Sequence, residues 1–180
     1  MRITKDNTSA VIIDIQERLF PHMYNREEFE RNVGILIKGL NLLKVPLMIT
    51  EQYSKGLGIT IPAISENLEG FDPIEKISFS CCGESRFLKE LNMLNKKFVI
   101  LAGIETHVCV LQTVLDLIES GFQPVLVEDC VSSRKENDKK VAIERIRREG
   151  AIITTYESIL LELCRIAGTE TFKQISGLIK

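Results

Sequence analysis

FVILAGIETHVC, residues 98–109, joins a fully apolar strand directly to the start of a helix. The run from Phe98 to Ala102 is typical of a buried strand, and from Thr106 the apolar spacing becomes helical. Cys109 follows in the first turns of that helix, where backbone N–H groups and the helix dipole favour a thiolate. The pattern indicates either a nucleophile or, since free cysteine is commonly buried, a thiol that only packs.

Similar apolar runs recur along the chain, with helical patterns between most of them. We expect strands at Ser9–Ile15, Pro46–Thr50, Ile74–Phe79, Phe98–Ala102, Gln123–Val127 and Ala151–Thr154. We expect helices at Glu27–Leu43, Arg86–Leu94, Thr106–Ser120, Asn137–Glu149 and Thr169–Ile175. Strands that are apolar on both faces and alternate with helices are typical of a parallel sheet covered on both sides. The sequence therefore predicts an α/β fold, a three-layer doubly wound sheet, mostly parallel, of about six strands in the order 3-2-1-4-5-6.

Length and composition narrow the class of protein. The 180 residues are 44% hydrophobic, which predicts a single domain over 1–180. The net charge of -2, spread along the chain, argues against nucleic acid or an anionic membrane as a partner. The sequence contains no apolar stretch long enough to predict a signal peptide or a membrane span. The five cysteines do not have the spacing of a zinc site, and their odd number favours free thiols. The expected compartment is therefore the reducing cytoplasm.

The expected topology predicts where a ligand binds. In a doubly wound sheet, ligands bind beyond the carboxyl ends of the strands, where the strand order reverses. Here that point lies between the first and fourth strands, so Asp14 is expected beside the segment Gly103–Cys109. The longest predicted loop, Glu51–Asp72, is a second functional candidate because loops of that length are often functional.

Two further residues give Cys109 a chemical context. Asp14 interrupts an apolar run at its C-terminal end, and beside Cys109 it would act as general base and acid. Lys76, on the expected third strand, would hold Asp14 ionised and favour the thiolate. Taken alone, Asp14 is equally a helix cap or a salt-bridged residue, and a lone lysine is usually a surface charge. The two residues carry meaning only as a set with Cys109.

The three segments together resemble the isochorismatase-like superfamily of cysteine hydrolases, which includes nicotinamidases and isochorismatases. The matching motifs are Asp14-Ile15-Gln16 with Phe20, Lys76-Ile77-Ser78-Phe79-Ser80, and the segment from Gly103 to Val110. The resemblance implies that Cys109 is the nucleophile, Asp14 the general base and acid, and Lys76 the residue that tunes both. It also implies an oxyanion hole from the backbone N–H groups of Glu105 and Cys109, and a cis peptide between Ile104 and Glu105.

Other positions follow from their place at strand ends or in the motifs. The expected substrate-binding residues are Phe20, Gln52, Tyr53, Phe79, Ile104, Glu105 and Thr106. His107 is not expected to pair with Cys109, because residues two apart on a helix project to different faces. The remaining thiols, Cys81 among them, are interpreted as structural.

One departure from the family narrows the chemistry. Nicotinamidases bind a metal through an Asp and histidines after the second strand, whereas residues 50–58 here contain no His. The only histidines in the chain are His22 and His107. We therefore expect no metal and no other cofactor.

The favoured hypothesis is a cysteine-dependent hydrolase that cleaves a C–N bond of a small amide through a thioester. The alternatives are an isochorismatase-type vinyl ether hydrolase, in which Asp14 protonates the substrate directly, and a catalytically idle interaction protein. The expected partners are a small-molecule substrate and, from the resemblance, further copies of the same chain in a homo-oligomer.

Overall fold

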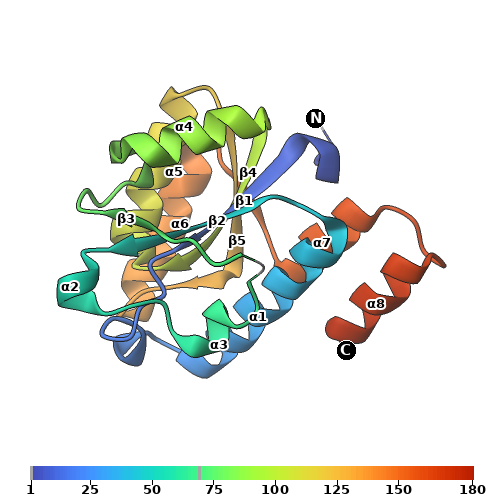
Figure 1. Cartoon of the computed structure of the whole chain (residues 1–180), viewed down its shortest axis with the longest axis horizontal. Helices are drawn as coiled ribbons and strands as arrows, with labels where there is room; N and C mark the ends of the chain where they lie inside the picture. The colour runs from blue at the N-terminus through green and yellow to red at the C-terminus, as the bar shows by residue number, and fades with distance from the viewer. Residues whose placement is uncertain (1, 69) are drawn as a thin grey trace.

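The computed structural model describes residues 2–68 and 70–180. Its strands form one sheet of six, all parallel, in the order β3-β2-β1-β4-β5-β6. They are β1 (Thr8–Ile13), β2 (Leu47–Gln52), β3 (Ile74–Lys76), β4 (Phe98–Ile104), β5 (Gln123–Ser132) and β6 (Ile152–Thr154). The predicted fold class and strand order are confirmed, with β1 and β4 adjacent at the centre of the sheet (Figure 1).

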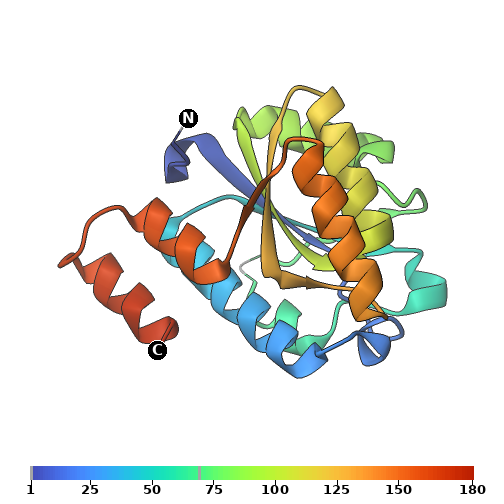
Figure 2. The same cartoon turned by 180° about the vertical axis from the view of Figure 1, so that it is seen from behind.

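Helices cover both faces of the sheet (Figures 1 and 2). One face carries α1 (Arg26–Leu43) and α7 (Tyr156–Cys164), with α8 (Glu170–Leu178) packed against both. The other face carries α4 (Ser85–Leu94), α5 (Leu111–Glu119) and α6 (Glu136–Arg148). Short helices complete the chain: η1 (Lys5–Asn7), η2 (Phe20–His22), α2 (Ser54–Leu57), α3 (Pro62–Ser65) and η3 (Cys81–Gly83). Among the described residues, no helix combines the length and apolarity needed to cross a membrane.

The core lies in two layers, one on each side of the sheet. On β1, Ala10 and Ile12 pack toward α1 and α7, while Val11 and Ile13 pack toward α4 and α5. Successive side chains of a strand point to opposite faces, so a strand covered on both sides must be apolar throughout. This explains why the central strands are continuous apolar runs in the sequence.

The element boundaries differ from the predicted ones at the edge that carries the functional candidates. The predicted first and third strands end too late, because β1 stops at Ile13 and β3 at Lys76. The predicted helix from Thr106 begins instead as a π-helix, η4 (Thr106–Val110), which continues into α5. The predicted loop 51–72 contains the end of β2 together with α2 and α3, and its Glu69 lies outside the described residues. Helix α7 was not predicted.

The register of the sheet brings several strand ends to one place. Ile13 on β1 pairs with Thr50 on β2 and with Gly103 on β4. Gln52 on β2 pairs with Lys76, the last residue of β3. The residues that follow β1 and β4 therefore meet at the carboxyl edge of the sheet, as predicted from the topology, and the end of β3 lies at the same edge.

Candidate active site

Asp14 is the first residue after β1, and its side chain is fully buried. Its backbone is in the left-handed region, with φ of 55°, which is uncommon for a residue with a side chain. Its N–H donates to the carbonyl of Thr50 at 3.2 Å. The turn thus takes the chain out of the strand while the carboxylate stays inside the protein.

Lys76 is the partner of this carboxylate. Its Nζ lies 2.7 Å from Asp14 Oδ2, and both side chains are inaccessible to solvent. The ammonium also donates to Gln52 Oε1 at 2.7 Å and to the carbonyls of Phe79 at 2.9 Å and Ser78 at 3.2 Å. A buried lysine is tolerated when its charge is paired and its donors are satisfied. The ion pair is therefore buried within the protein.

Thr50 supports the other oxygen of Asp14, a role that sequence analysis missed. Thr50 Oγ1 donates to Asp14 Oδ1 at 2.7 Å and lies 3.7 Å from Cys81 Sγ. Cys81 is fully buried, and its backbone N–H donates to Thr113 Oγ1 at 3.0 Å. The Thr113 hydroxyl in turn donates to the carbonyl of Cys109 at 2.7 Å, so it links the two cysteines. The parallel pairing of the first two strands was the available signal, because it places Thr50 beside the residue that precedes Asp14.

Cys109 lies in η4, is 4% exposed, and its thiol interacts with the Asp14 carboxylate. Burial raises the pKa of this thiol, the charge of Asp14 raises it further, and Lys76 acts in the opposite direction. Burial and the adjacent carboxylate thus shift this pKa in the direction opposite to the thiolate expected from the helix start. The arrangement places a neutral thiol beside a carboxylate that can accept its proton.

The segment before Cys109 has an unusual backbone. Glu105 has φ of 56°, in the left-handed region, and it immediately precedes the π-helix. No cis peptide bond occurs in the described part of the chain, so the one expected between Ile104 and Glu105 is absent there. Gly103 has φ of 144°, and a Cβ at this position would lie 2.3 Å from the carbonyl oxygen of Ile13. Only glycine fits this close approach of β4 to β1.

Comparison with known proteins identifies the family. The family model for the isochorismatase domain matches residues 8–158. Isochorismatase family protein 1B of Dictyostelium discoideum is 38% identical over 184 residues, covering 99% of this chain and 89% of the relative. The chain belongs to the isochorismatase family.

Solved structures of this fold agree with the assignment. The structure described as MAR1 ribonuclease from Caenorhabditis elegans is 37% identical, with a TM-score of 0.93, over 99% of this chain and 92% of the other. YcaC from Pseudomonas aeruginosa is 25% identical, with a TM-score of 0.92, over 98% of this chain and 91% of the other. Membership of the isochorismatase family supports a hydrolase activity.

The residues expected to bind substrate occupy different environments in this isochorismatase-family chain. Tyr53 and Phe79 are about half exposed, on loops that adjoin Lys76. Gln52 is buried and donates through Nε2 to the carbonyl of Ile77 at 2.6 Å, so both ends of its amide are used. Phe20 packs partly buried against Phe29. These positions make Tyr53 and Phe79 the side chains of this group most available to a ligand.

The remaining expected residues lie on the Cys109 side of the site. Ile104 is fully buried in the core, and the buried Thr106 donates through Oγ1 to the carbonyl of Ser132 at 2.8 Å. His107 Nδ1 lies 3.0 Å from Ser133 Oγ, and its Nε2 lies 3.7 Å from Glu105 Oε2. His107 thus contacts the end of β5, in agreement with the prediction that it forms no dyad with Cys109.

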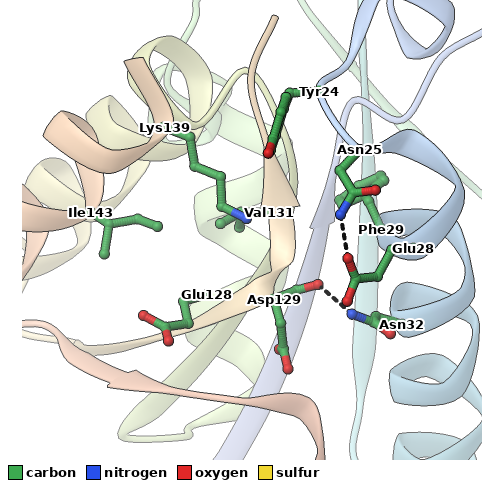
Figure 3. A pocket seen from close by; sticks show the side chains of 10 residues that line it. All are labelled: Tyr24, Asn25, Glu28, Phe29, Asn32, Glu128, Asp129, Val131, Lys139 and Ile143. Carbon is green, nitrogen blue, oxygen red and sulfur yellow. Dashed lines mark hydrogen bonds between the residues drawn. The ribbon is translucent and has the colours of Figure 1, made fainter. Parts of the chain in front are cut away.

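Two observations bear on other ligands. Within residues 2–68 and 70–180, no three His, Cys, Asp or Glu side chains come together as a metal site. A cavity of about 310 Å³ lies between α1, β5 and α6, away from Asp14, Lys76 and Cys109. Figure 3 shows the Lys139 side chain directed into it, and burial lowers the pKa of that lysine. The cavity is separate from the candidate active site.

Proposed function

We propose that this chain is a cysteine hydrolase that cleaves a C–N bond of a small amide through a thioester on Cys109. The observation that carries the proposal is the buried Asp14–Lys76 ion pair beside a buried thiol. A base adjacent to a nucleophile, with that base oriented by a third group, is the usual arrangement for covalent acyl transfer. Family membership supports hydrolysis. The presence of Asp14 and Lys76 with the Cys109 thiol favours hydrolysis through a covalent cysteine intermediate.

In the first half of the reaction, Cys109 attacks the amide carbonyl. As the S–C bond forms, the thiol proton passes to the Asp14 carboxylate, which is why a thiol with a raised pKa needs this neighbour. The backbone N–H groups of Glu105 and Cys109 stabilise the oxyanion. The intermediate collapses as the C–N bond breaks, and Asp14 gives its proton to the leaving amine.

In the second half, water hydrolyses the thioester. Asp14 takes a proton from the attacking water, and a C–O bond forms at the acyl carbon. The C–S bond then breaks, the acid is released, and Asp14 returns the proton to Cys109. Lys76 keeps the carboxylate in place throughout by its contact at 2.7 Å.

YcaC of Pseudomonas aeruginosa offers chemical support. It is described with hexane-2,5-diol and covalent acrylamide. Acrylamide is attacked by nucleophiles at its alkene and not at its amide, so this description supports a nucleophilic side chain in a related chain of this fold. The half-exposed Tyr53 and Phe79 favour a substrate with an apolar portion.

The test is a screen of small primary and secondary amides, scored by released ammonia or amine. Wild-type turnover that is lost in Cys109→Ala and Asp14→Asn, and retained in Cys164→Ala, supports the proposal; Cys164 is the matched thiol outside the site, at the end of α7. Pyruvate release from a vinyl ether that survives Cys109→Ala would favour the isochorismatase-type reaction. A folded chain inert to both substrate classes would favour an interaction protein.

RNA cleavage is a second candidate, favoured by the Caenorhabditis elegans relative described as a ribonuclease. The net charge of -2 argues against broad affinity for RNA phosphates. Incubation with single-stranded RNA, compared between wild type and Asp14→Asn, separates a site-dependent nuclease from a contaminant.

The assembly and compartment also belong to the proposal. Four large apolar side chains around the site are at least half exposed: Tyr53, Ile59, Ile77 and Phe79. Apolar exposure of this kind is typical of a surface that binds substrate or a second copy. We propose a homo-oligomer, tested by light scattering of wild type against Ile77→Glu.

All five cysteines are free, which supports a reducing compartment such as the cytoplasm.

A further inference from the structure

The Glu105 side chain is a buried carboxylate, four residues before Cys109 in the sequence, that the proposed reaction does not use. It is 6% exposed, although glutamate is rarely buried without a partner. Its residue also has the strained backbone that starts the π-helix, with φ of 56°. Such strain costs about 1–3 kcal/mol and persists only where the surroundings enforce it.

Arg134, which follows β5, supplies the enforcing contact. Its Nε lies 3.1 Å from Glu105 Oε1, and its Nη2 donates to Oε2 at 3.4 Å. The nearer contact is out of line for a hydrogen bond, so in the described structure Oε1 is held by charge rather than by a donor. The Arg134 side chain itself is 60% exposed. An exposed cation therefore holds a buried carboxylate at the residue that immediately precedes the π-helix of Cys109.

The end of β5 and the residue after it also contact the first two residues of η4. Thr106 Oγ1 donates to the carbonyl of Ser132 at 2.8 Å, and His107 Nδ1 lies 3.0 Å from Ser133 Oγ. Three successive residues before Cys109 are thus tied to three successive residues at the end of β5. Among these ties, only the one between Glu105 and Arg134 joins two oppositely charged side chains.

The backbone of Glu105 links this tie to the nucleophile. Its carbonyl accepts from the N–H of Val108 at 2.8 Å and of Val110 at 3.4 Å, which are the bonds on either side of Cys109. A shift of Glu105 would therefore turn the peptide groups around the thiol. π-turns of this kind occur frequently at functional sites.

We infer that the Glu105 carboxylate and Arg134 are positioning residues for the oxyanion hole. They hold the backbone so that the N–H groups of Glu105 and Cys109 face the developing oxyanion. The inference rests on the proposed function, because it presumes acyl transfer to Cys109. The inferred role of both side chains is exerted through the backbone of Glu105.

The experiment compares two reactions of Cys109 that differ in their need for an oxyanion hole. p-Nitrophenyl acetate acetylates the thiol through a tetrahedral oxyanion and releases p-nitrophenolate, whereas iodoacetamide alkylates it by displacement of iodide without one. Misplaced donors should lower the ratio of acetylation to alkylation rates at Cys109 about tenfold in Arg134→Gln and Glu105→Gln. Arg134→Lys keeps the charge and should recover part of the ratio.

Arg148→Gln is the matched control, since it removes an exposed arginine from an ion pair with Glu144 on α6. It should leave the ratio unchanged. An unchanged ratio in Arg134→Gln overturns the inference, and so does a parallel fall of both rates, which would indicate general disorder of the loop. A wild-type chain that is alkylated but never acetylated at Cys109 instead overturns the proposed function.

Discussion

The ammonium of Lys76 lies 2.7 Å from the carboxylate of Asp14, and neither side chain reaches solvent. Each charge depends on the other, because removing one partner of a buried pair leaves an uncompensated charge in a medium of low polarity. Thr50 and Gln52 complete the hydrogen bonds of the pair. The stability of the fold and the base for Cys109 therefore rest on the same contact.

Lys76→Met should destabilise the protein by about 3–5 kcal/mol, since Asp14 would be left buried and unpaired. The double variant Asp14→Asn, Lys76→Met should recover much of that loss. Urea unfolding measures both. Arg86→Met is the control, because its ion pairs with Asp72 and Glu90 are exposed and each is worth at most about 1 kcal/mol. Equal losses for Lys76→Met and Arg86→Met would contradict the buried pair.

The pKa of Cys109 should respond to its two charged neighbours in opposite directions. In wild type, alkylation of Cys109 should rise at a pH above the ordinary thiol value of about 8.5, because burial and Asp14 both raise the pKa. Asp14→Asn should move that rise to lower pH, and Lys76→Met to higher pH. Mass mapping of each thiol after timed alkylation gives the profiles, and a wild-type rise below the ordinary value would refute this account.

Cys81 should make the protein less stable in alkali. Burial, and then the charge of Asp14, raise its pKa from the ordinary thiol range to about 11. Above the ordinary value the unfolded chain releases this proton while the folded chain keeps it. The free energy of unfolding therefore falls by about 1.4 kcal/mol per pH unit for this thiol until the folded pKa is reached.

Urea unfolding between pH 8 and 11 tests this effect through the slope of stability against pH. Cys81→Ala should show a shallower slope than wild type, whatever its stability at neutral pH. Cys164→Ala, which removes a thiol at the end of α7, is the comparison variant for the loss of a cysteine. Identical slopes in all three proteins would show that Cys81 does not titrate as proposed.

The sequence was sufficient for features that depend on patterns along the chain. Continuous apolar runs predicted the parallel sheet, and the strand order then placed Asp14 beside the Cys109 segment. Features that depend on the local environment were missed. The direction of the Cys109 pKa shift is set by burial and by a carboxylate from another strand, and neither has a signature near residue 109. The same holds for Arg134, which meets Glu105 only through the pairing of β4 with β5.

Gly103→Ala should disrupt the junction between β1 and β4. The residue has φ of 144°, and an added Cβ would lie 2.3 Å from the backbone oxygen of Ile13, which cannot move without distorting β1. We expect a loss of at least about 2 kcal/mol in the free energy of unfolding and slower alkylation of Cys109. Gly177→Ala is the matched control, because a Cβ at this position on α8 meets open space. Alanine there should raise the free energy of unfolding by up to about 1 kcal/mol, because it favours the helix more than glycine does. If Gly103→Ala keeps wild-type stability and alkylation, then the close approach of these two strands does not set the position of the nucleophile segment, and its geometry must come from the contacts with β5 instead.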